Sequence, residues 1–438
     1  MNYVLYSVSQ PYQRTMTNIL ICTVGGSHQP IVTAINEQQP DHVIFICTDK
    51  DPATGRPGSN VQITGTGNCI KARPQDDKPT LPNIPAQTGL SPEQYQVCLC
   101  YADDLDQIYL TCGEAINDAL SRFPAARIIA DYTGGTKSMS AALAMAVLEH
   151  QEIELQLMAG SRGDLVKVQD GSQYAAVANI ERLRFERLIA PYRHAWTRHA
   201  YSEAEAGLKL IRPPHQSELR GRYTRFRDLS RAFAEWDNFN HAAALDIIQR
   251  YAPSLSPALK SYLPIAMRLN DQNAGKRDAA RLFDLYLNAL RRAAQGRYDD
   301  AIARIYRLIE WTAQWLLKNL CDIETANVNQ ADIPEGVMLT RNRDGQWQAG
   351  LFNAWQLIKH KTSGEAARFI AREENSLLDH LKIRNGSILA HGFEPVKARD
   401  WQIIQTWLEQ QFMPMLLAES ARVGIKAMPQ QLPDRFEL

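Results

Sequence analysis

Residues 127–139 read RIIADYTGGTKSM, and this stretch decides the fold of the first half of the chain. Its first five residues form a short apolar run with β-branched side chains, which is typical of a buried strand. A pair of glycines follows, and residues 137–150 have the pattern of a helix. The stretch therefore predicts a strand, a tight glycine turn and a helix in direct succession.

The same alternation extends in both directions from this stretch. Strands alternating with helices predict an α/β, Rossmann-like domain, in which helices cover both faces of a parallel sheet. Residues 49–92 interrupt the alternation and are rich in Pro, Gly, Thr and Asn, so we expect an inserted hairpin or a covering loop there. Residues 163–177 predict a small hairpin with Asp170 and Gly171 at its turn. The further strands are expected at residues 18–24, 42–48, 95–100 and 153–158, and the further helices at 29–37 and 105–122.

The second half of the chain has a different composition. All eight Trp residues follow position 195, whereas six of the seven Cys residues precede position 113, and the later residues have helical patterns almost throughout. At about 150 residues per domain, the 438 residues correspond to about three domains. We expect the Rossmann-like domain at residues 1–180, a helical connecting domain at 181–285 and a final helical domain at 286–438.

The charge is also divided between the two halves. The 48 Lys and Arg residues balance the 48 Asp and Glu residues, so the formal net charge is zero. Up to residue 180 there are 11 basic and 18 acidic residues, a net of −7, and the remainder has a net of +7. The total argues against a protein that coats nucleic acid through a general positive field, while the basic half still allows attraction to RNA.

The overall composition excludes several other classes of protein. A hydrophobic fraction of 45% with 22% charged residues is unlike disordered, collagen-like or low-complexity chains. No apolar run approaches the roughly 18 residues of a membrane span, and no secretory signal pattern is present, so we expect a cytoplasmic protein without a membrane partner. The odd number of cysteines predicts reduced thiols, with Cys98 and Cys100 on one face of a strand, and no residue set has metal-ligand spacing, so no metal is expected.

Two glycine-containing loops form the candidate ligand site of the first half. They read TVGGSH at residues 23–28 and YTGGTKS at residues 132–138. Loops that follow the strands of a parallel sheet border the ligand crevice, glycines admit a close approach, and helix N-termini attract anions. We therefore predict a phosphate-bearing ligand held by Gly25, Gly26, Ser27, His28, Thr133, Gly134, Gly135, Thr136, Lys137 and Ser138.

The loops match neither of two common nucleotide motifs. The P-loop spacing G-x-x-x-x-G-K-[ST] and the dinucleotide spacing G-x-G-x-x-G are both absent, which weighs against ATPase and dehydrogenase functions. A structural alternative stays open, namely that both loops are only tight turns between strand and helix. His28 also has two interpretations, as a contact to an adenine or phosphate of the ligand or as a residue at a helix start that faces water.

An arginine and a histidine near the C-terminus form the candidate catalytic pair. If one helix continues through residues 381–392, Arg384 and His391 lie within roughly 20° around its axis and share a face. Arginine is a permanent planar cation and histidine titrates near neutrality, so the pair suits metal-free RNA cleavage by attack of a 2′-hydroxyl, with Asn385 as a donor to a phosphate oxygen. The alternative is a chance pair on a solvated face. Gly386 instead favours a turn, followed by a helix capped by Ser387.

Together these motifs resemble a known architecture. Residues 24–27 and 131–139 resemble the ligand loops of CARF domains, the Rossmann-like sensors of type III CRISPR accessory proteins. Residues 384–391 resemble the R-N-x(4-6)-H signature of HEPN ribonucleases, with six residues between arginine and histidine. A sensor followed by helices and then a nuclease matches the CARF-HEPN ribonucleases of the Csm/Csx type.

The resemblance implies a mechanism for antiviral defence. Residues 286–438 would be a HEPN nuclease domain, and a cyclic oligoadenylate would bind across a homodimer of sensor domains and activate it allosterically. Tetra-adenylate is favoured over hexa-adenylate as this activator, and no cofactor is implied besides it. Arg384, Asn385 and His391 of both chains would form one composite site that cleaves single-stranded RNA without a metal. Two alternatives stay open: a nucleotide-sensing regulatory protein without nuclease activity, and a sensor that degrades its own ligand with Thr133, Thr136, Lys137 and Ser138 around the phosphates.

Overall fold

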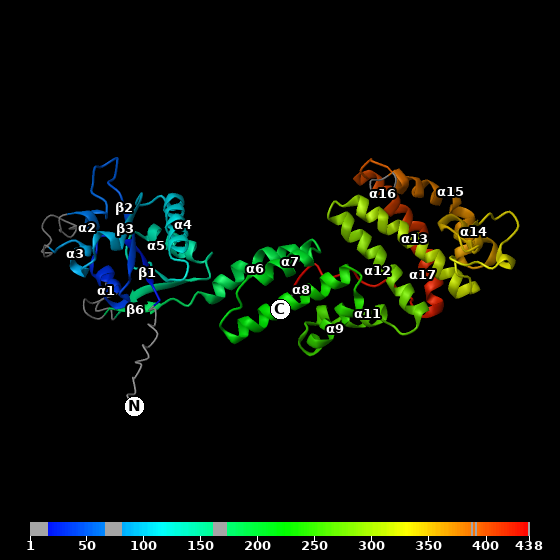
Figure 1. The fold of residues 1–438 in the computed structure, drawn as a ribbon, viewed down its shortest axis with the longest axis horizontal. Coiled ribbons are helices and arrows are strands. Elements are labelled where there is room, and N and C mark those ends of the chain that lie inside the picture. The colour runs from blue at the N-terminus through cyan, green and yellow to red at the C-terminus, as the bar shows by residue number, and fades with distance from the viewer. Residues whose placement is uncertain (1–15, 66–80, 161–172, 387–388, 390–391, 437–438) are drawn as a thin grey trace, which may run out of the picture. The chain divides into compact units, whose positions relative to one another are not determined.

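The computed structural model describes residues 16–65, 81–160, 173–386, 389 and 392–436 (Figure 1). The chain divides into two compact units, residues 1–188 and 189–438, with the boundary inside helix α6 (Glu181–Thr197). The first unit is built around a sheet and the second almost wholly from helices. The further division of the helical half at residue 285 stays a proposal.

The first unit contains a six-stranded sheet with the order β3-β2-β1-β4-β5-β6. Neighbouring strands from β3 to β5 pair in parallel, and β6 pairs antiparallel with β5. Ile21 in the central strand lies opposite Ile44 on one side and Ala130 on the other. The α/β, Rossmann-like prediction is therefore confirmed. The strands are β1 (Asn18–Val24), β2 (His42–Thr48), β3 (Tyr95–Cys100), β4 (Arg127–Asp131), β5 (Ile153–Ala159) and β6 (Tyr174–Val177).

Helices cover both faces of the sheet because its strands are apolar on both sides. Successive side chains of a strand point to opposite faces. Ile19 and Ile21 accordingly belong to the core under α4 (Leu105–Arg122) and α5 (Lys137–Val147). Leu20 and Cys22 belong to the core under α1 (Gln29–Gln38). The central strands are thus buried from both sides, as expected for a parallel sheet.

The insert at residues 49–92 covers one of these faces. Its described parts, residues 49–65 and 81–92, contain the short helices α2 (Val61–Thr64) and α3 (Ile84–Thr88) and no strand, so the expected hairpin is not found there. Ile63 and Ile84 are fully buried in the core under α1, which confirms the covering role. Of the second expected hairpin, the turn lies outside the described residues, and the later arm is β6.

The six cysteines of the described residues are free thiols, and four of them are buried in the first unit: Cys22, Cys47, Cys100 and Cys112. Burial raises the pKa of Cys100 to about 11 and that of Cys112 to about 12. Cys98 and Cys100 contribute to the same core cluster on one face of β3, as predicted. Thiols with raised pKa values are protonated at neutral pH and act as small apolar side chains. Cys69 lies outside the described residues.

The second unit packs its helices around two groups of large rings. Trp196 is fully buried and contacts Tyr201, Phe226, Phe233 and Phe436 with ring centroids 5.1–5.9 Å apart. These contacts explain why the tryptophans gather in the second half. In the described part of the chain, no helix is long and apolar enough to cross a membrane. The main helices after α6 are α7 (Tyr201–Leu210), α8 (Ser217–Asp237), α9 (His241–Tyr251), α11 (Tyr262–Leu269), α12 (Ala274–Ala294), α13 (Tyr298–Cys321), α14 (Leu351–Lys361), α15 (Glu365–Gly386), α16 (Ala398–Trp407) and α17 (Met413–Ser420).

The second group of rings lies near the C-terminal helices. Trp355 in α14 is fully buried and its ring lies 5.5 Å from that of Phe369 in α15. Phe412, just before α17, contacts both of these rings and that of Trp407. The start of α15 is therefore held against α14 and α17 by aromatic packing, which is worth about 0.5–1.5 kcal/mol per pair beyond the buried area.

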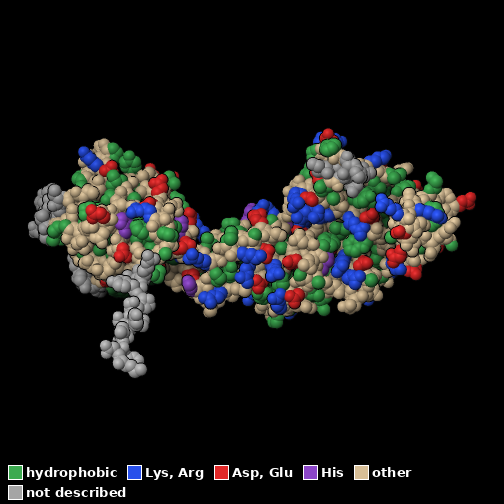
Figure 2. Space-filling model, in the orientation of Figure 1, with side chains coloured by type: hydrophobic (Ala, Val, Ile, Leu, Met, Phe, Trp, Pro, Cys, Tyr) green, Lys and Arg blue, Asp and Glu red, His purple; other side chains and the backbone are tan. Residues whose placement is uncertain are grey.

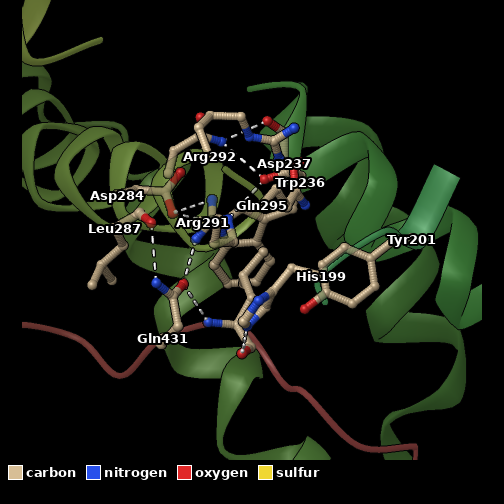
Figure 3. A network of polar contacts seen from close by, with 12 residues as sticks. His199, Tyr201, Trp236, Asp237, Asp284, Leu287, Arg291, Arg292, Gln295 and Gln431 are labelled. Atoms are coloured by element: carbon tan, nitrogen blue, oxygen red, sulfur yellow. Dashed lines mark hydrogen bonds and ion pairs between the residues drawn. The ribbon is translucent and has the colours of Figure 1, made fainter. Parts of the chain in front are cut away.

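A network of buried charges joins α8 to α12 (Figure 3). Asp237 at the end of α8 accepts a hydrogen bond from Arg291 Nε at 2.7 Å and pairs with Arg292 as well. Asp284 accepts hydrogen bonds from Trp236 Nε1 at 3.0 Å and from the buried His241 ring at 2.8 Å. Arg291 is only 1% exposed, so its charge depends on these partners.

The chain returns to these helices after α17. Backbone carbonyls of Gln431 and Pro433 accept hydrogen bonds from the hydroxyls of Tyr262 at 2.8 Å and Tyr201 at 2.5 Å. The Gln431 side chain also bonds Arg291, as Figure 3 shows. The C-terminal segment thereby ties α7, α11 and α12 together.

Candidate functional site

The two glycine loops leave the sheet at its topological switch point. From β1 the chain continues to β2 on one side, and from β4 it continues to β5 on the other side. The loops after these two adjacent strands therefore diverge to opposite faces, and a crevice forms between them at the carboxyl edge of the sheet. Ligands of open α/β sheets bind in this position. The strand order thus places both predicted loops at the same edge.

The backbones of the two loops touch each other. Thr23 Oγ1 donates a hydrogen bond to the Gly134 carbonyl at 2.7 Å. A Cβ atom on Gly25 would lie 2.7 Å from the Gly135 nitrogen, and one on Gly134 would lie 2.2 Å from the Thr23 carbonyl oxygen. Gly135 also has a positive φ of 84°, which favours glycine. Three of the four glycines are therefore required by loop packing, as the tight-turn alternative proposes.

Gly26 is different, because its surroundings are open. It is exposed, and a Cβ atom there would have no neighbouring atom within 4 Å. The Gly26 carbonyl accepts a hydrogen bond from Gln62 Nε2 at 3.2 Å. Gln62 lies in α2 of the insert and is only 3% exposed. The insert therefore holds the inner side of the first glycine loop, and the outer side of this loop stays accessible.

The threonines of the second loop hold the loop in place. Thr133 Oγ1 accepts a hydrogen bond from the Met158 N–H at 2.7 Å. Thr136 Oγ1 donates to the Ala102 carbonyl at 2.8 Å and accepts from the Met139 N–H at 3.3 Å, which caps α5. Both hydroxyls are therefore engaged within the protein, and their first role is to shape the loop.

Four predicted residues lie at the starts of α1 and α5. Ser27 is exposed, and the half-buried His28 is the N-cap of α1 without a side-chain capping bond. Lys137 and Ser138 are the first two residues of α5, so their N–H groups have no acceptor inside the helix. Lys137 is exposed and adds its charge to the positive end of the helix dipole. An anion at this edge would meet backbone N–H groups and a mobile cation.

A buried carboxyl group at the start of the 131–139 motif supports the second loop, although Asp131 was not among the predicted ligand-binding residues. Asp131, at the end of β4, is 3% exposed and accepts hydrogen bonds from the Thr133 N–H at 2.9 Å and from Gln156 Nε2 at 3.0 Å. Burial raises the pKa of Asp131 because it disfavours the charged form. Asp131, Gln62 and the Ala102 carbonyl all form hydrogen bonds that hold the two loops. No sequence spacing indicates these contacts, so only the structure reveals them.

The candidate catalytic segment begins in the last turn of α15. Arg384 and Asn385 lie in this turn and α15 ends at Gly386, while Leu389 lies in a turn and is 51% exposed. One helix therefore does not continue through to Leu389, and the shared-face argument for Arg384 and His391 loses its premise. His391 and the possible cap Ser387 lie outside the described residues, as do the side-chain positions of Arg384 and Asn385.

One turn before Arg384, His380 packs against the core. Its ring centroid lies 4.6 Å from that of Trp407, and the Trp407 Nε1 donates to Glu373 Oε2 at 3.0 Å. Burial lowers the pKa of His380, so the neutral imidazole is favoured. His380 thus anchors the end of α15. In the described part of the chain, no three His, Cys, Asp or Glu side chains are grouped to hold a metal ion.

Comparison with known proteins gives a family match for the helical half and a structural match for the whole fold. Residues 270–413 match the family model described as the Csm6 HEPN domain, and this segment contains Arg384, Asn385 and His391. No curated protein matches the chain. The structure resembles that of Enterococcus italicus Csm6 bound to cyclic hexa-2′-fluoro-hexa-dAMP, with a TM-score of 0.58 and 12% identity over 93% of this chain and 95% of that one.

Residues 270–413 are thus similar to the Csm6 HEPN domain, and the chain as a whole shares the fold of Enterococcus italicus Csm6. The first unit of this chain has a Rossmann-like fold, and its helical half contains the segment that matches the HEPN domain. The HEPN match begins at residue 270, inside the connecting region expected at residues 181–285. A second solved structure is that of Can2 from Sulfobacillus thermosulfidooxidans in complex with cyclic tetra-adenylate. It matches 55% of this chain and 67% of its own at 13% identity, and its TM-score of 0.24 is too low to indicate a common fold.

Proposed function

We propose that this protein is a CARF-HEPN nuclease, namely a metal-independent endoribonuclease that cleaves single-stranded RNA and is activated by a cyclic oligoadenylate. The observation that carries the proposal is the position of Arg384, Asn385 and His391 inside the segment that matches the Csm6 HEPN domain. The glycine loops at the switch point of the sheet support the sensing half, because they offer backbone N–H groups and Lys137 to a phosphate-bearing ligand.

The proposed reaction uses the RNA's own 2′-hydroxyl. Its oxygen forms a bond to the adjacent phosphorus while the bond from phosphorus to the 5′-oxygen breaks, which leaves a 2′,3′-cyclic phosphate and a 5′-hydroxyl. One proton leaves the 2′-hydroxyl and one reaches the departing 5′-oxygen. We assign proton transfer to His391 and stabilisation of the phosphate charge to Arg384, with Asn385 donating to a non-bridging oxygen.

A homodimer fits this chemistry and the activator. A cyclic oligoadenylate has rotational symmetry, so two copies of the same loops can hold it around a two-fold axis. Ligand binding would then favour the arrangement in which Arg384 and His391 of two chains form one composite site. The tetra-adenylate preference stays a prediction. Because Enterococcus italicus Csm6 was solved with a cyclic hexa-dAMP analogue, both ring sizes belong in the test.

The test is cleavage of labelled single-stranded RNA in EDTA, with no activator, with cyclic tetra-adenylate and with cyclic hexa-adenylate. We expect strong activation by one ring, and loss of cleavage in Arg384→Ala and His391→Ala. Absence of cleavage under all conditions, or full cleavage by both variants, would contradict the proposal. Analytical ultracentrifugation of the same protein reports whether the active species is a dimer.

The regulatory alternative, a sensor without nuclease activity, predicts ligand binding without RNA cleavage, so the same experiment separates the two. Degradation of the ligand by the sensor is a further activity that chromatography of the recovered activator would detect. The hydroxyls of Thr133 and Thr136 weigh against it, because both already bond backbone atoms of the first unit. Recovery of linear oligoadenylates would instead support it.

A further inference from the structure

The strongest local excess of positive charge lies outside both candidate sites. The segment from residue 209 to residue 227 contains six basic residues and one acidic residue. It covers the end of α7, the turn at Pro213 and Pro214, and the first half of α8. Figure 2 shows Lys and Arg side chains on the surface over α8. The basic residues are Lys209, Arg212, Arg220, Arg222, Arg225 and Arg227.

A pocket of about 450 Å³ opens along this part of α8. Its lining residues on α8 are three and four positions apart, so they form one face of the helix. A Cβ atom on Gly221 would have no neighbour within 4 Å, so the middle of this face is open. The lining residues are Ser217, Arg220, Gly221, Thr224 and Arg225, with Tyr251 from α9. We call this set the α8 basic face.

Arg220 is oriented without losing its charge. Its Nε donates to the Pro214 carbonyl at 2.9 Å and its Nη2 to the His215 carbonyl at 3.2 Å. Carbonyl oxygens fix the guanidinium but carry no formal charge, so they do not neutralise it. The side chain is thus held ready for an anion.

Arg225 has an unpaired donor at its Nε atom, which is buried and has no hydrogen-bond partner within the described part of the chain. The nearby carboxylate of Asp228 is occupied, since it pairs with Arg227 at 2.9 Å and accepts from the Tyr251 hydroxyl at 2.5 Å. A buried donor without an acceptor is costly, and a planar guanidinium is suited to two phosphate oxygens. An incoming phosphate would satisfy it.

We propose that the α8 basic face binds the phosphodiester backbone of single-stranded RNA and holds the substrate at a second place, away from residues 384–391. This inference rests on the proposed ribonuclease function. Five residues of helix separate Arg220 from Arg225 by about 7.5 Å along the axis, which suits different phosphates of one strand better than one small anion. The hydroxyls of Ser217 and Thr224 line the same pocket and add neutral donors beside the two arginines.

The experiment measures binding of fluorescein-labelled single-stranded RNA by anisotropy, with full-length protein carrying His391→Ala so that cleavage does not interfere. The test variants are Arg225→Ala, which removes no hydrogen bond of the described residues, and Arg220→Ala/Arg225→Ala. The control is Arg250→Ala, an exposed arginine on α9 that already pairs with Asp246. We expect the double variant to raise Kd about tenfold and to lower the slope of log K against log salt by about 1.4, or about 0.7 for each lost phosphate contact.

An unchanged Kd and salt slope in both test variants would overturn the inference. The inference would also be overturned if a polyglutamate peptide competed for the α8 basic face as well as unlabelled RNA does, because the face would then bind acidic proteins. Failure of the ribonuclease proposal is seen separately, as absent cleavage in wild-type protein, because the binding measurement needs neither cleavage nor activator. If wild-type protein cleaves RNA, Arg225→Ala should raise KM for long RNA and leave kcat unchanged.

Discussion

The backbone of Gly25 lies so close to the backbone of Gly135 that a methyl group on Gly25 would be 2.7 Å from the Gly135 nitrogen. These residues come from different loops, after β1 and β4, which are adjacent only in the folded sheet. The contact fixes how the two loops face each other at the switch point. This contact therefore fixes the spacing of the two loops, to which any ligand that contacts both of them must fit.

Replacement of Gly25 by alanine should separate the loops. The added Cβ would overlap backbone atoms, which cannot rotate away as a side chain can, and overpacking of this kind costs about 1–3 kcal/mol. We expect the activator concentration for half-maximal cleavage to rise about tenfold or more in Gly25→Ala. Gly113→Ala in α4 is the matched control, because its Cβ would also have no neighbour within 4 Å and the residue lies outside both glycine loops. Equal responses of the two variants would contradict the role of the loop contact.

Lys137 supplies the mobile cation of the proposed sensor site. Reversal of its charge at the start of α5 would place a carboxylate where the helix dipole and the proposed ligand's phosphates meet. We expect Lys137→Glu to weaken binding of the activating cyclic oligoadenylate at least about tenfold, equal to about 1.4 kcal/mol, by calorimetric titration. Lys260→Glu, at an exposed lysine of the second unit, should leave Kd within about twofold. Identical affinities would exclude Lys137 from the site.

The periodicity of the first half was sufficient to predict its sheet. The central strands β1 and β2 are short, continuous apolar runs, such as HVIFICT at residues 42–48, because both faces are covered and nearly every side chain is buried. The insert was predicted less well. The packing of Ile63 and Ile84 depends on contacts with α1 that leave no local pattern, and its composition could not distinguish a hairpin from short helices.

The candidate sites were predictable only in part. Glycine pairs after two strands predicted the two loops that meet at the switch point, since such residues mark tight turns and close approaches, and their role in ligand binding stays a prediction. The supporting contacts of Gln62 and Asp131 join segments that are 25 to 36 residues apart, so no spacing rule indicates them. The spacing of Arg384 and His391 revealed the motif in the sequence. The prediction that one helix carries both residues was not met, because α15 ends at Gly386, which lies between them.

The buried ion pair between Asp237 and Arg291 should matter strongly for stability. Removal of the carboxylate in Asp237→Ala would leave Arg291 and Arg292 without their shared partner in a buried site, which costs about 3–5 kcal/mol. We expect a large fall in the unfolding midpoint in urea, monitored by tryptophan fluorescence. Asp246→Ala removes an exposed pair with Arg250 and should cost less than about 1 kcal/mol. Similar losses in both variants would show that the network is not buried in solution.

Stability should also fall below neutral pH because of His199. Its ring bonds the Leu432 carbonyl at 3.2 Å, and burial, with Arg291 nearby, lowers its pKa below the ordinary 6.5. The unfolded chain therefore takes up a proton near pH 6.5 while the folded protein does so only at lower pH. The loss of folding stability that His199 causes is therefore absent above the pKa of the unfolded chain. It grows as the pH falls from this pKa to the lower pKa of the folded protein.

Urea midpoints at about pH 7.5 and about pH 5.5 test this dependence. We expect a lower midpoint at the acidic value, and a smaller difference between the two in His199→Gln, because glutamine retains a donor for the Leu432 carbonyl and does not titrate. His194→Gln, at an exposed position of the same helix region, should keep the wild-type difference. If His199→Gln keeps it as well, the protonation that destabilises the fold occurs elsewhere, and His42 and His380, whose pKa values burial also lowers, become the next candidates.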